Sequence, residues 1–190
     1  MVMAEATNHY FKHLGVSDGL SQVCIPSIYQ DELGAVWLGT TEGLNRYNGK
    51  DVKVFQPSES NHGLTNNEIN ELCGDKNGRM YIRSGNDLIK LDIYTEQFTC
   101  LRQKGVYGLF CKKDTLWVSC ADGIYYYTGQ GTELTFFARV QKGFVGRALY
   151  VDKETVWVVT RKYLVAISRE DPLRQEILLT LDKGNCILGD

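Results

Sequence analysis

Three histidines, six cysteines and a recurring aspartate are the residues of this 190-residue chain that could carry acid–base, nucleophilic or metal chemistry. The histidines are His9, His13 and His62, and each is better explained as a surface residue than as a catalytic base. A general base must lie within hydrogen-bond reach of the proton that it removes, in a constellation that the sequence does not indicate. We therefore predict no catalytic residues in this chain.

The cysteines could bind zinc or form disulfides, but none of them belongs to a Cys-x-x-Cys motif. Cys24, Cys73 and Cys111 fall at corresponding places of three short apolar runs. Free cysteine is among the residues most often found inside proteins. We expect the cysteines to be buried thiols, with a disulfide as the open alternative and with no zinc site.

Aspartate recurs before each of four aromatic residues, at Asp31, Asp75, Asp114 and Asp152. Four carboxylates could suggest calcium, but calcium needs six or more oxygen atoms that converge on one point. These aspartates are spread along the chain in short polar turns, where the side chain can bond its own backbone. We expect turn-forming aspartates and neither a metal ion nor another cofactor.

A repeat positions these residues. An eleven-residue pattern begins, at intervals of 44, 36 and 40 residues, with the aromatic residues Trp37, Tyr81, Trp117 and Trp157. Its eighth position is always apolar, and its seventh is glycine in two copies, Gly43 and Gly123. Two antiparallel strands joined by a short turn require this alternation and a turn residue that tolerates positive φ.

Each copy has an apolar run before it and a further strand after it, which gives four short strands per unit. A period near 40 residues is the size of one propeller blade. The predicted fold class is therefore all-β, with about four four-stranded antiparallel blades of a larger, seven-bladed propeller. We expect the signature aromatic residues in the core between blades rather than on a sugar-stacking platform.

The repeat also sets the expected boundaries. We expect an N-terminal extension at 1–9, a closing fourth strand of the last blade at 10–18, and the start of a truncated fifth blade at 183–190. The four blades between them are expected at 19–62, 63–103, 104–141 and 142–182. The chain is thus expected to be part of a longer protein.

The composition, 43% hydrophobic and 23% charged with a net charge of −2, is typical of a folded globular unit. No basic stripe is present to neutralise phosphates, so a nucleic-acid partner is not expected. No apolar run approaches the ~20 residues that span a bilayer, so membrane contact is not expected either. The first six residues lack the features of a signal peptide, and a targeting segment is not expected in this chain.

Residues 19–22 and 28–49 together resemble the two-component regulator propeller repeat. The lead-in at 10–14 and 18–21 is similar to the usual start of the mature sensor. The second copy resembles the repeat well, and the third and fourth are related to it through the period. The resemblance extends over residues 10–190.

The resemblance implies the periplasmic ligand-sensing part of a Bacteroides-type hybrid two-component sensor histidine kinase, a protein of the inner membrane. In that family the blades precede an immunoglobulin-like domain, a membrane helix and a kinase core. An oligosaccharide typically binds the periplasmic region of a dimer and switches on genes for polysaccharide use. The implied partners are thus an oligosaccharide, the remaining blades and the immunoglobulin-like domain of the parent chain, and a second copy. This part of the kinase would not itself be an enzyme.

Propeller ligands usually lie against the turns between second and third strands and the linkers between blades, because these loops converge. Their planar hydrogen-bonding groups suit sugar hydroxyls, and arginine suits acidic sugars. The candidate ligand-binding residues are Thr41, Glu42, Asn86, Asp87, Asp122, Arg147, Arg161 and Lys162.

An alternative function is a non-catalytic interaction module. Four blades leave two sheet faces and one strand edge in water, which is costly. Self-association would cover these surfaces and complete the open ring.

Overall fold

The computed structural model describes residues 12–57, 63–140 and 145–181, with the side chains of Val145, Arg147 and Ala148 left out. Sixteen strands form four antiparallel sheets in this part of the chain, and each sheet takes its four strands in chain order. The structure confirms the predicted all-β class and the four-stranded antiparallel blades, whereas the number of blades in a complete ring remains a prediction.

The first sheet consists of β1 (Ser27–Gln30), β2 (Val36–Thr40), β3 (Gly43–Tyr47) and β4 (Val52–Phe55). The second consists of β5 (Ile69–Gly74), β6 (Arg79–Ser84), β7 (Asp87–Asp92) and β8 (Gln97–Arg102). The third consists of β9 (Val106–Lys112), β10 (Thr115–Cys120), β11 (Gly123–Tyr127) and β12 (Thr135–Ala138). The fourth consists of β13 (Val145–Val151), β14 (Thr155–Thr160), β15 (Tyr163–Ser168) and β16 (Gln175–Thr180).

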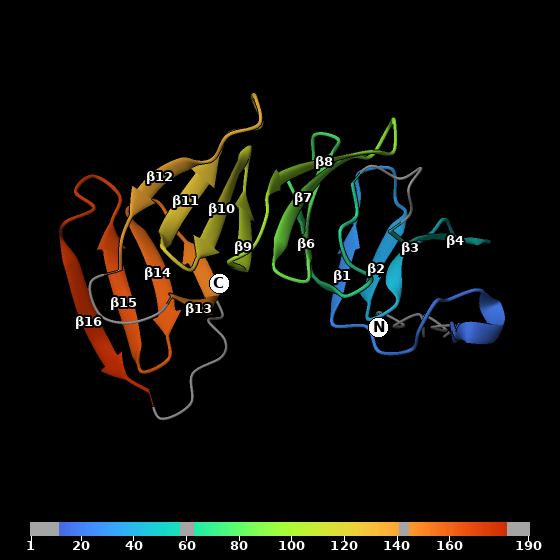
Figure 1. Ribbon diagram of the computed structural model, residues 1–190, viewed down its shortest axis with the longest axis horizontal. Helices are drawn as coiled ribbons and strands as arrows, with labels where there is room; N and C mark the ends of the chain where they lie inside the picture. The colour runs from blue at the N-terminus through green and yellow to red at the C-terminus, as the bar shows by residue number, and fades with distance from the viewer. Residues whose placement is uncertain (1–11, 58–62, 141–144, 182–190) are drawn as a thin grey trace, which may run out of the picture.

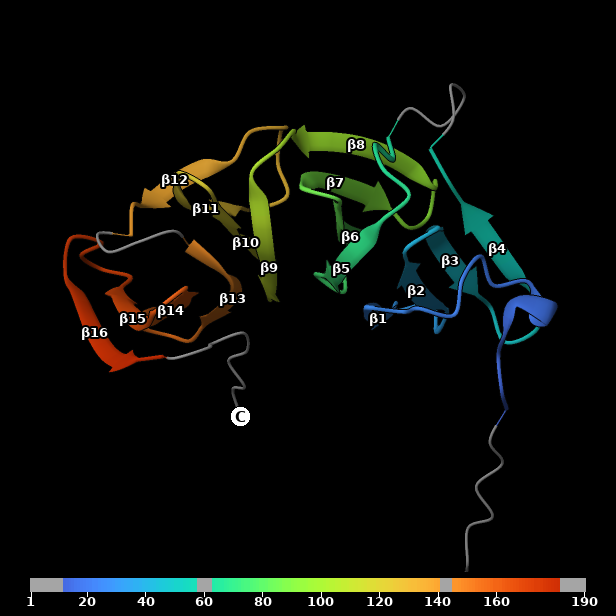
Figure 2. The same cartoon turned by 60° about the horizontal axis from the view of Figure 1, so that its bottom comes forward.

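The four sheets, called blades one to four here, stand side by side in an open arc (Figure 1). Figure 2 shows that the first strand of each blade lies on the inner side of the arc and the fourth strand on the outer side. Turns between first and second strands therefore lie at one end of the blades, and turns between second and third strands at the other.

The core lies between neighbouring blades and follows the repeat. Trp37 and Leu44 of blade one pack against Ile82 and other apolar residues of blade two. Tyr81 of blade two likewise lies in a cluster with apolar residues of blade three, and Trp117 of blade three lies in one with those of blade four. Position one of each repeat thus faces the next blade along the chain.

Trp157 differs from the other signature residues in exposure. Trp37 and Tyr81 are fully buried and Trp117 is 5% exposed, whereas Trp157 is only half-buried. Because position one faces the next blade, the side chain of Trp157 belongs to the outer face of the last blade that the structure describes. The outer strand of the same blade carries the exposed residues Ile177, Leu178 and Leu179.

The backbone requires the glycines at position seven of blades one and three. Gly43 has φ +126° and Gly123 has φ +156°. A Cβ atom added to Gly43 would lie 2.7 Å from the carbonyl oxygen of Phe55, and one added to Gly123 would lie 2.6 Å from that of Ala138. The close approach of the fourth strand at this point leaves no room for a side chain.

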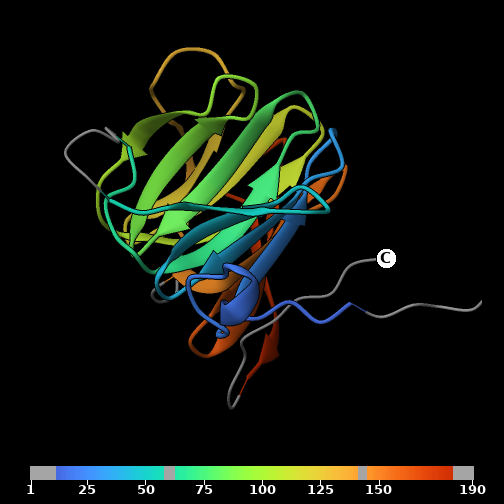
Figure 3. The same cartoon turned by 90° about the vertical axis from the view of Figure 1, so that its right-hand side faces the viewer.

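The described residues 12–18 of the segment expected to close the ring at 10–18 form no strand here, and the closing strand stays a prediction. Residues 12–15 have no regular structure, and Val16–Asp18 form the 3-10 helix η1, which faces the viewer beside the first sheet in Figure 3. A strand is stable only with a hydrogen-bonded neighbour, and the described residues from 12 to 18 pair with none of the sixteen strands. Residues 1–11 and 182–190, and with them the expected extension and the truncated fifth blade, lie outside the described residues.

The linker that follows η1 is attached to blade one. Leu20 is 3% exposed, and the Ser21 amide donates to Asn45 Oδ1 at 2.9 Å. Asn66 and Ser84 form the corresponding linker contact of blade two, since the Asn66 amide donates to Ser84 Oγ at 3.0 Å. In the described part of the chain, no helix has the length and apolar character needed to span a bilayer.

Candidate functional site

Two of the recurring aspartates each hold a turn and a tryptophan. Asp31 is 4% exposed, and its Oδ1 accepts from the amides of Leu33 at 3.0 Å and Ala35 at 2.9 Å. Its Oδ2 accepts from the Trp37 indole at 2.7 Å. These bonds use both carboxylate oxygens within one blade, so Asp31 anchors its own turn.

Asp152 repeats this arrangement in blade four. Its Oδ1 accepts from the amides of Glu154 and Thr155, and its Oδ2 accepts from the Trp157 indole at 2.8 Å. Desolvation alone would raise the pKa of this carboxyl, but the hydrogen bonds from Trp157 and the two amides outweigh it and hold the pKa below its ordinary value.

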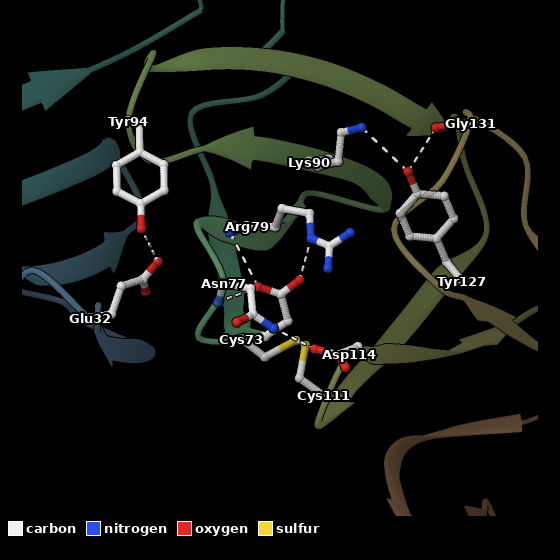
Figure 4. A network of polar contacts seen from close by, with 11 residues as sticks. Glu32, Cys73, Asn77, Arg79, Lys90, Tyr94, Cys111, Asp114, Tyr127 and Gly131 are labelled. Carbon is white, nitrogen blue, oxygen red and sulfur yellow. Dashed lines mark hydrogen bonds and ion pairs between the residues drawn. The ribbon is translucent and has the colours of Figure 1, made fainter.

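Blades two and three modify the motif. In blade two the Asp75 carboxylate pairs with Arg79, and the buried hydroxyl of Tyr81 has no hydrogen-bond partner among the described residues. In blade three Asp114 accepts from the side chain of Asn77 in the neighbouring blade, as Figure 4 shows. No group of three or more possible metal ligands occurs among the residues that the structure describes.

Three of the candidate ligand-binding residues gather at the linker between blades two and three. Asp87 Oδ1 accepts from the Lys104 amide at 2.6 Å, and the Asn86 carbonyl accepts from the Val106 amide at 3.0 Å. Asp122 Oδ1 forms an ion pair with Arg102 Nη2 at 2.8 Å. The candidates of two neighbouring blades thus surround one linker.

Beside this linker lies a group that we name the rim cluster: Arg102, Asp122, Tyr125 and Phe136. The Tyr125 hydroxyl donates to Asp122 Oδ2 at 2.7 Å, and the Arg102 guanidinium lies 4.6 Å from the Tyr125 ring centroid. Phe136 packs edge-on against Tyr125 and is 53% exposed. Desolvation alone would raise the pKa of Asp122, but the hydrogen bonds from Tyr125 and Arg102 outweigh it and hold the pKa below its ordinary value. The carboxylate therefore stays charged.

The other candidates lie on other turns. Thr41 and Glu42 form the turn between β2 and β3, where the Glu42 carbonyl accepts from Gln56 Nε2 at 2.8 Å. Arg161 and Lys162 form the exposed turn between β14 and β15. Arg147 lies in β13, and its side chain is outside the description.

One arginine inside blade two was not expected from the sequence. Arg83 is 7% exposed, and its guanidinium bonds Glu71 Oε2 at 3.3 Å and Asn70 Oδ1 at 3.0 Å. Glu71 Oε1 also accepts from the Leu109 amide of blade three at 3.1 Å. The signal was present, because Arg83 stands at position three of the repeat, where the other copies have Gly39, Ser119 and Val159.

A groove of about 400 Å³ lies between blades three and four at the opposite end of the strands. The charged and aromatic residues that line it include Lys112, Lys113, Asp114, Trp117, Asp152, Lys153 and Arg169. Arg169 Nη1 bonds the carbonyls of Asp152 and Lys153, and Lys112 Nζ bonds that of Val151. Arg169 and Lys112 thus hold backbone carbonyls along this groove.

The cysteines are less uniform than expected. Cys120 is buried, but Cys24 is exposed and precedes β1, so the expectation that it is a buried inner-strand residue is wrong. The apolar run from Cys24 to Tyr29 begins before the chain reaches the sheet, because Pro26 cannot donate to a strand ladder. Cys73 and Cys111 are half-buried near the ends of β5 and β9. They do not occupy corresponding places as expected, because Cys73 pairs with Tyr81 whereas Phe110, the residue before Cys111, pairs with Trp117.

Comparison with known proteins supports the repeat. A family model described as "Two component regulator propeller" matches residues 19–42. A histidine kinase of Formosa agariphila is 40% identical over 53 residues, which are 28% of this chain and 4% of that protein.

The extracellular domain assigned to a hybrid two-component system of B. thetaiotaomicron has a TM-score of 0.75 at 21% identity. The match covers 92% of this chain and 27% of that one. A second such domain from this organism has a TM-score of 0.63 at 20% identity and covers 87% and 22% of the two chains. At these identities the structures show a shared fold.

The chain spans much less than two thirds of the length of each of these relatives. The matched segment 19–42 contains the blade-one linker, β1, β2 and the Asp31–Trp37 contact. The chain therefore contains a two-component regulator propeller repeat in blade one, and its four sheets have the fold of those extracellular domains.

Proposed function

We propose that this chain is the N-terminal propeller part of the ligand-sensing region of a hybrid two-component sensor histidine kinase, on the periplasmic side of the inner membrane. The observation that carries the proposal is the family repeat at 19–42 within a four-blade arc that has the fold of extracellular domains of such systems. The similarity to a histidine kinase supports the same assignment. In this proposal the chain senses, and the catalytic kinase core lies elsewhere in the parent protein.

The proposed ligand is an oligosaccharide, and the proposed site is the rim cluster with the neighbouring turn residues Asn86 and Asp87. Phe136 offers an exposed aromatic edge on which a sugar ring can pack. Asp122 and Arg102 offer planar charged groups that hydrogen-bond hydroxyl, carboxylate or sulfate groups. A ligand there would contact residues of blades two and three at once.

Binding at such a junction would favour one arrangement of neighbouring blades, which is how a ligand shifts an equilibrium between two states. The parent protein would pass this bias to its kinase through the remaining blades and the immunoglobulin-like domain of a dimer. The proposed output is the expression of genes for polysaccharide use.

The test is genetic. A strain that lacks the gene for the parent protein is grown on a panel of polysaccharides, and transcripts of polysaccharide-use genes are measured. On one polysaccharide the transcripts should fail to rise, and the wild-type gene should restore them, whereas a gene carrying Arg102→Ala together with Asp122→Asn should restore them poorly. The proposal fails if no polysaccharide response depends on the gene.

A second candidate function is an interaction module that self-associates to complete its open ring. It is favoured by the half-buried Trp157 and by the exposed residues Ile177 and Leu179 on the outer strand of blade four. Light scattering tests this second function. A self-associating module should be a dimer in its wild-type form and a monomer as the Leu179→Asp variant. If the wild-type chain and the variant are both monomers, the chain is not such a module.

A further inference from the structure

The innermost strands of neighbouring blades meet at one repeated contact. The residue that pairs with the signature aromatic is Tyr29 in β1, Cys73 in β5 and Phe110 in β9. Between blades one and two, the first step along the arc, a Cβ atom added at Gly74 would collide with the Tyr29 side chain. In the third step the ring of Phe110 lies 5.1 Å from that of Tyr150 and packs in the cluster that contains Val151.

At the second step this contact joins two cysteines. Cys73 corresponds to Tyr29 in blade one, and Cys111 corresponds to Gly74, because each stands one residue further along its inner strand. Their sulfur atoms are 2.7 Å apart. Figure 4 shows the two side chains pointing toward each other. This distance is below the ~3.5–4.0 Å at which unbonded carbon atoms pack. It exceeds the ~2.05 Å of a disulfide bond by less than one ångström.

We propose that Cys73 and Cys111 form a disulfide bond that joins the inner strands of blades two and three. The oxidant is a small-molecule disulfide such as oxidised glutathione. The thiolate of one cysteine attacks a glutathione sulfur and displaces one glutathione thiolate, and the thiolate of the second cysteine then attacks the mixed disulfide and displaces the other. Two protein thiols and one glutathione disulfide thus become one protein disulfide and two glutathione thiols.

The surroundings fit a bond that forms slowly and then persists. Both cysteines are half-buried, so a small oxidant reaches them at the edge of the core. Burial, together with the hydrogen bond to Cys111, raises the pKa of the Cys73 thiol well above its ordinary value. Oxidation should therefore be faster at pH ~8.5 than at neutral pH, since only the thiolate reacts.

The bond would close a loop between residues 38 positions apart and would restrict the unfolded chain. A disulfide across a loop of this length should raise the melting temperature by about 5–10 °C. Its presence in the cell depends on the proposed function, because disulfides persist in a periplasm and not in cytosol. Its formation in the purified chain does not depend on that proposal.

The test is peptide mapping of the purified wild-type chain after oxidation by glutathione disulfide and alkylation of the remaining thiols. Trypsin releases Cys73 in the peptide 54–76 and Cys111 in the peptide 105–112, each with a single cysteine. These two peptides should be recovered as one cross-linked species, two hydrogens lighter than their sum, that dithiothreitol separates. The melting temperature should fall on reduction.

Variants supply the control. Cys111→Ser should abolish both the cross-linked species and the effect of dithiothreitol on the melting temperature, while Cys24→Ser at an exposed site should retain both. Two separate peptides after oxidation, or Cys73 joined instead to Cys24, Cys100, Cys120 or Cys186, would overturn the proposal. The peptide map of the wild-type chain shows whether the disulfide forms, even if Cys111→Ser does not fold.

Discussion

At the scale of single residues, the aspartates that precede Trp37 and Trp157 are structural anchors. The Asp31–Trp37 and Asp152–Trp157 bonds show why tryptophan suits position one, since its indole reaches the turn carboxylate while its rings face the next blade. The sequence predicted the turn role of these aspartates from their place in the repeat. It did not predict the indole bond, because the spacing alone does not define which side chain turns back toward the carboxylate.

Tyr81 stands at position one of blade two in place of a tryptophan, and its hydroxyl provides a test of what a polar group at this position contributes to stability. The hydroxyl is buried without a partner among the described residues, so Tyr81→Phe should raise the free energy of unfolding by about 1 kcal/mol. The Tyr127 hydroxyl, in contrast, donates to the Gly131 carbonyl at 2.7 Å, and Tyr127→Phe should lower the free energy by about 1 kcal/mol. Urea unfolding of both variants measures this, and a loss of stability in Tyr81→Phe would show that its hydroxyl has a partner.

The lowered pKa of Asp152 predicts a dependence of stability on pH. An unfolded aspartate has a pKa of about 3.9, and the folded value lies below it, so the stabilisation is complete above about pH 5 and is lost as pH falls through the folded value. Asp152→Asn should therefore be less stable than wild type near pH 6 and should lose less on acidification. Urea midpoints at several pH values measure this.

The control for the pH effect is Asp171→Asn, at an exposed turn that has no tryptophan bond. It should keep the wild-type slope of stability against pH. An Asp152→Asn slope equal to that of wild type would show that the carboxylate of Asp152 makes no net contribution.

At the scale of elements, the sequence predicted the strands well because side chains alternate along them and glycine marks the turns. It failed where the outcome depends on contacts far along the chain. Residues 12–18 belong to the segment expected as a closing strand but pair with none of the sixteen strands, and Arg102, the last residue of β8, reaches Asp122 of blade three through a contact that no local pattern defines. Asp122 could be named as a candidate because it lies in a turn of the repeat, whereas Tyr125 and Phe136 look like ordinary strand residues in the sequence.

Substitution of Gly43 tests whether the close approach of the fourth strand excludes a side chain at position seven of blade one. Gly43→Ala should cost at least about 2 kcal/mol of folding free energy, because its φ is positive and a Cβ atom would collide with the Phe55 carbonyl. Gly49 also has a positive φ, +98°, but an added Cβ would meet nothing within 4 Å, so Gly49→Ala should cost only about 1 kcal/mol. Equal losses in thermal or urea unfolding would show that the close approach of the fourth strand does not matter.

At the scale of the whole molecule, neighbouring blades share their core. Trp117 is covered by blade four, while Trp157 faces away from the described blades. Trp117→Ala should therefore cost about 3–5 kcal/mol, and Trp157→Ala about half as much. Comparing their urea midpoints measures the difference, and a Trp157 cost equal to that of Trp117 would show that this face is covered in solution.

The central claim is that the blades form a sensor surface for an oligosaccharide at the rim cluster. Titration calorimetry of the chain against neutral, uronate-containing and sulfated oligosaccharides tests it most directly, with Arg102→Ala and Asp122→Asn as site variants and Asp171→Asn as the control. The account predicts that one class binds, that each site variant weakens binding at least about tenfold, a loss of about 1.4 kcal/mol, and that the control does not. Binding that survives both site variants, or no binding by any class, would contradict it.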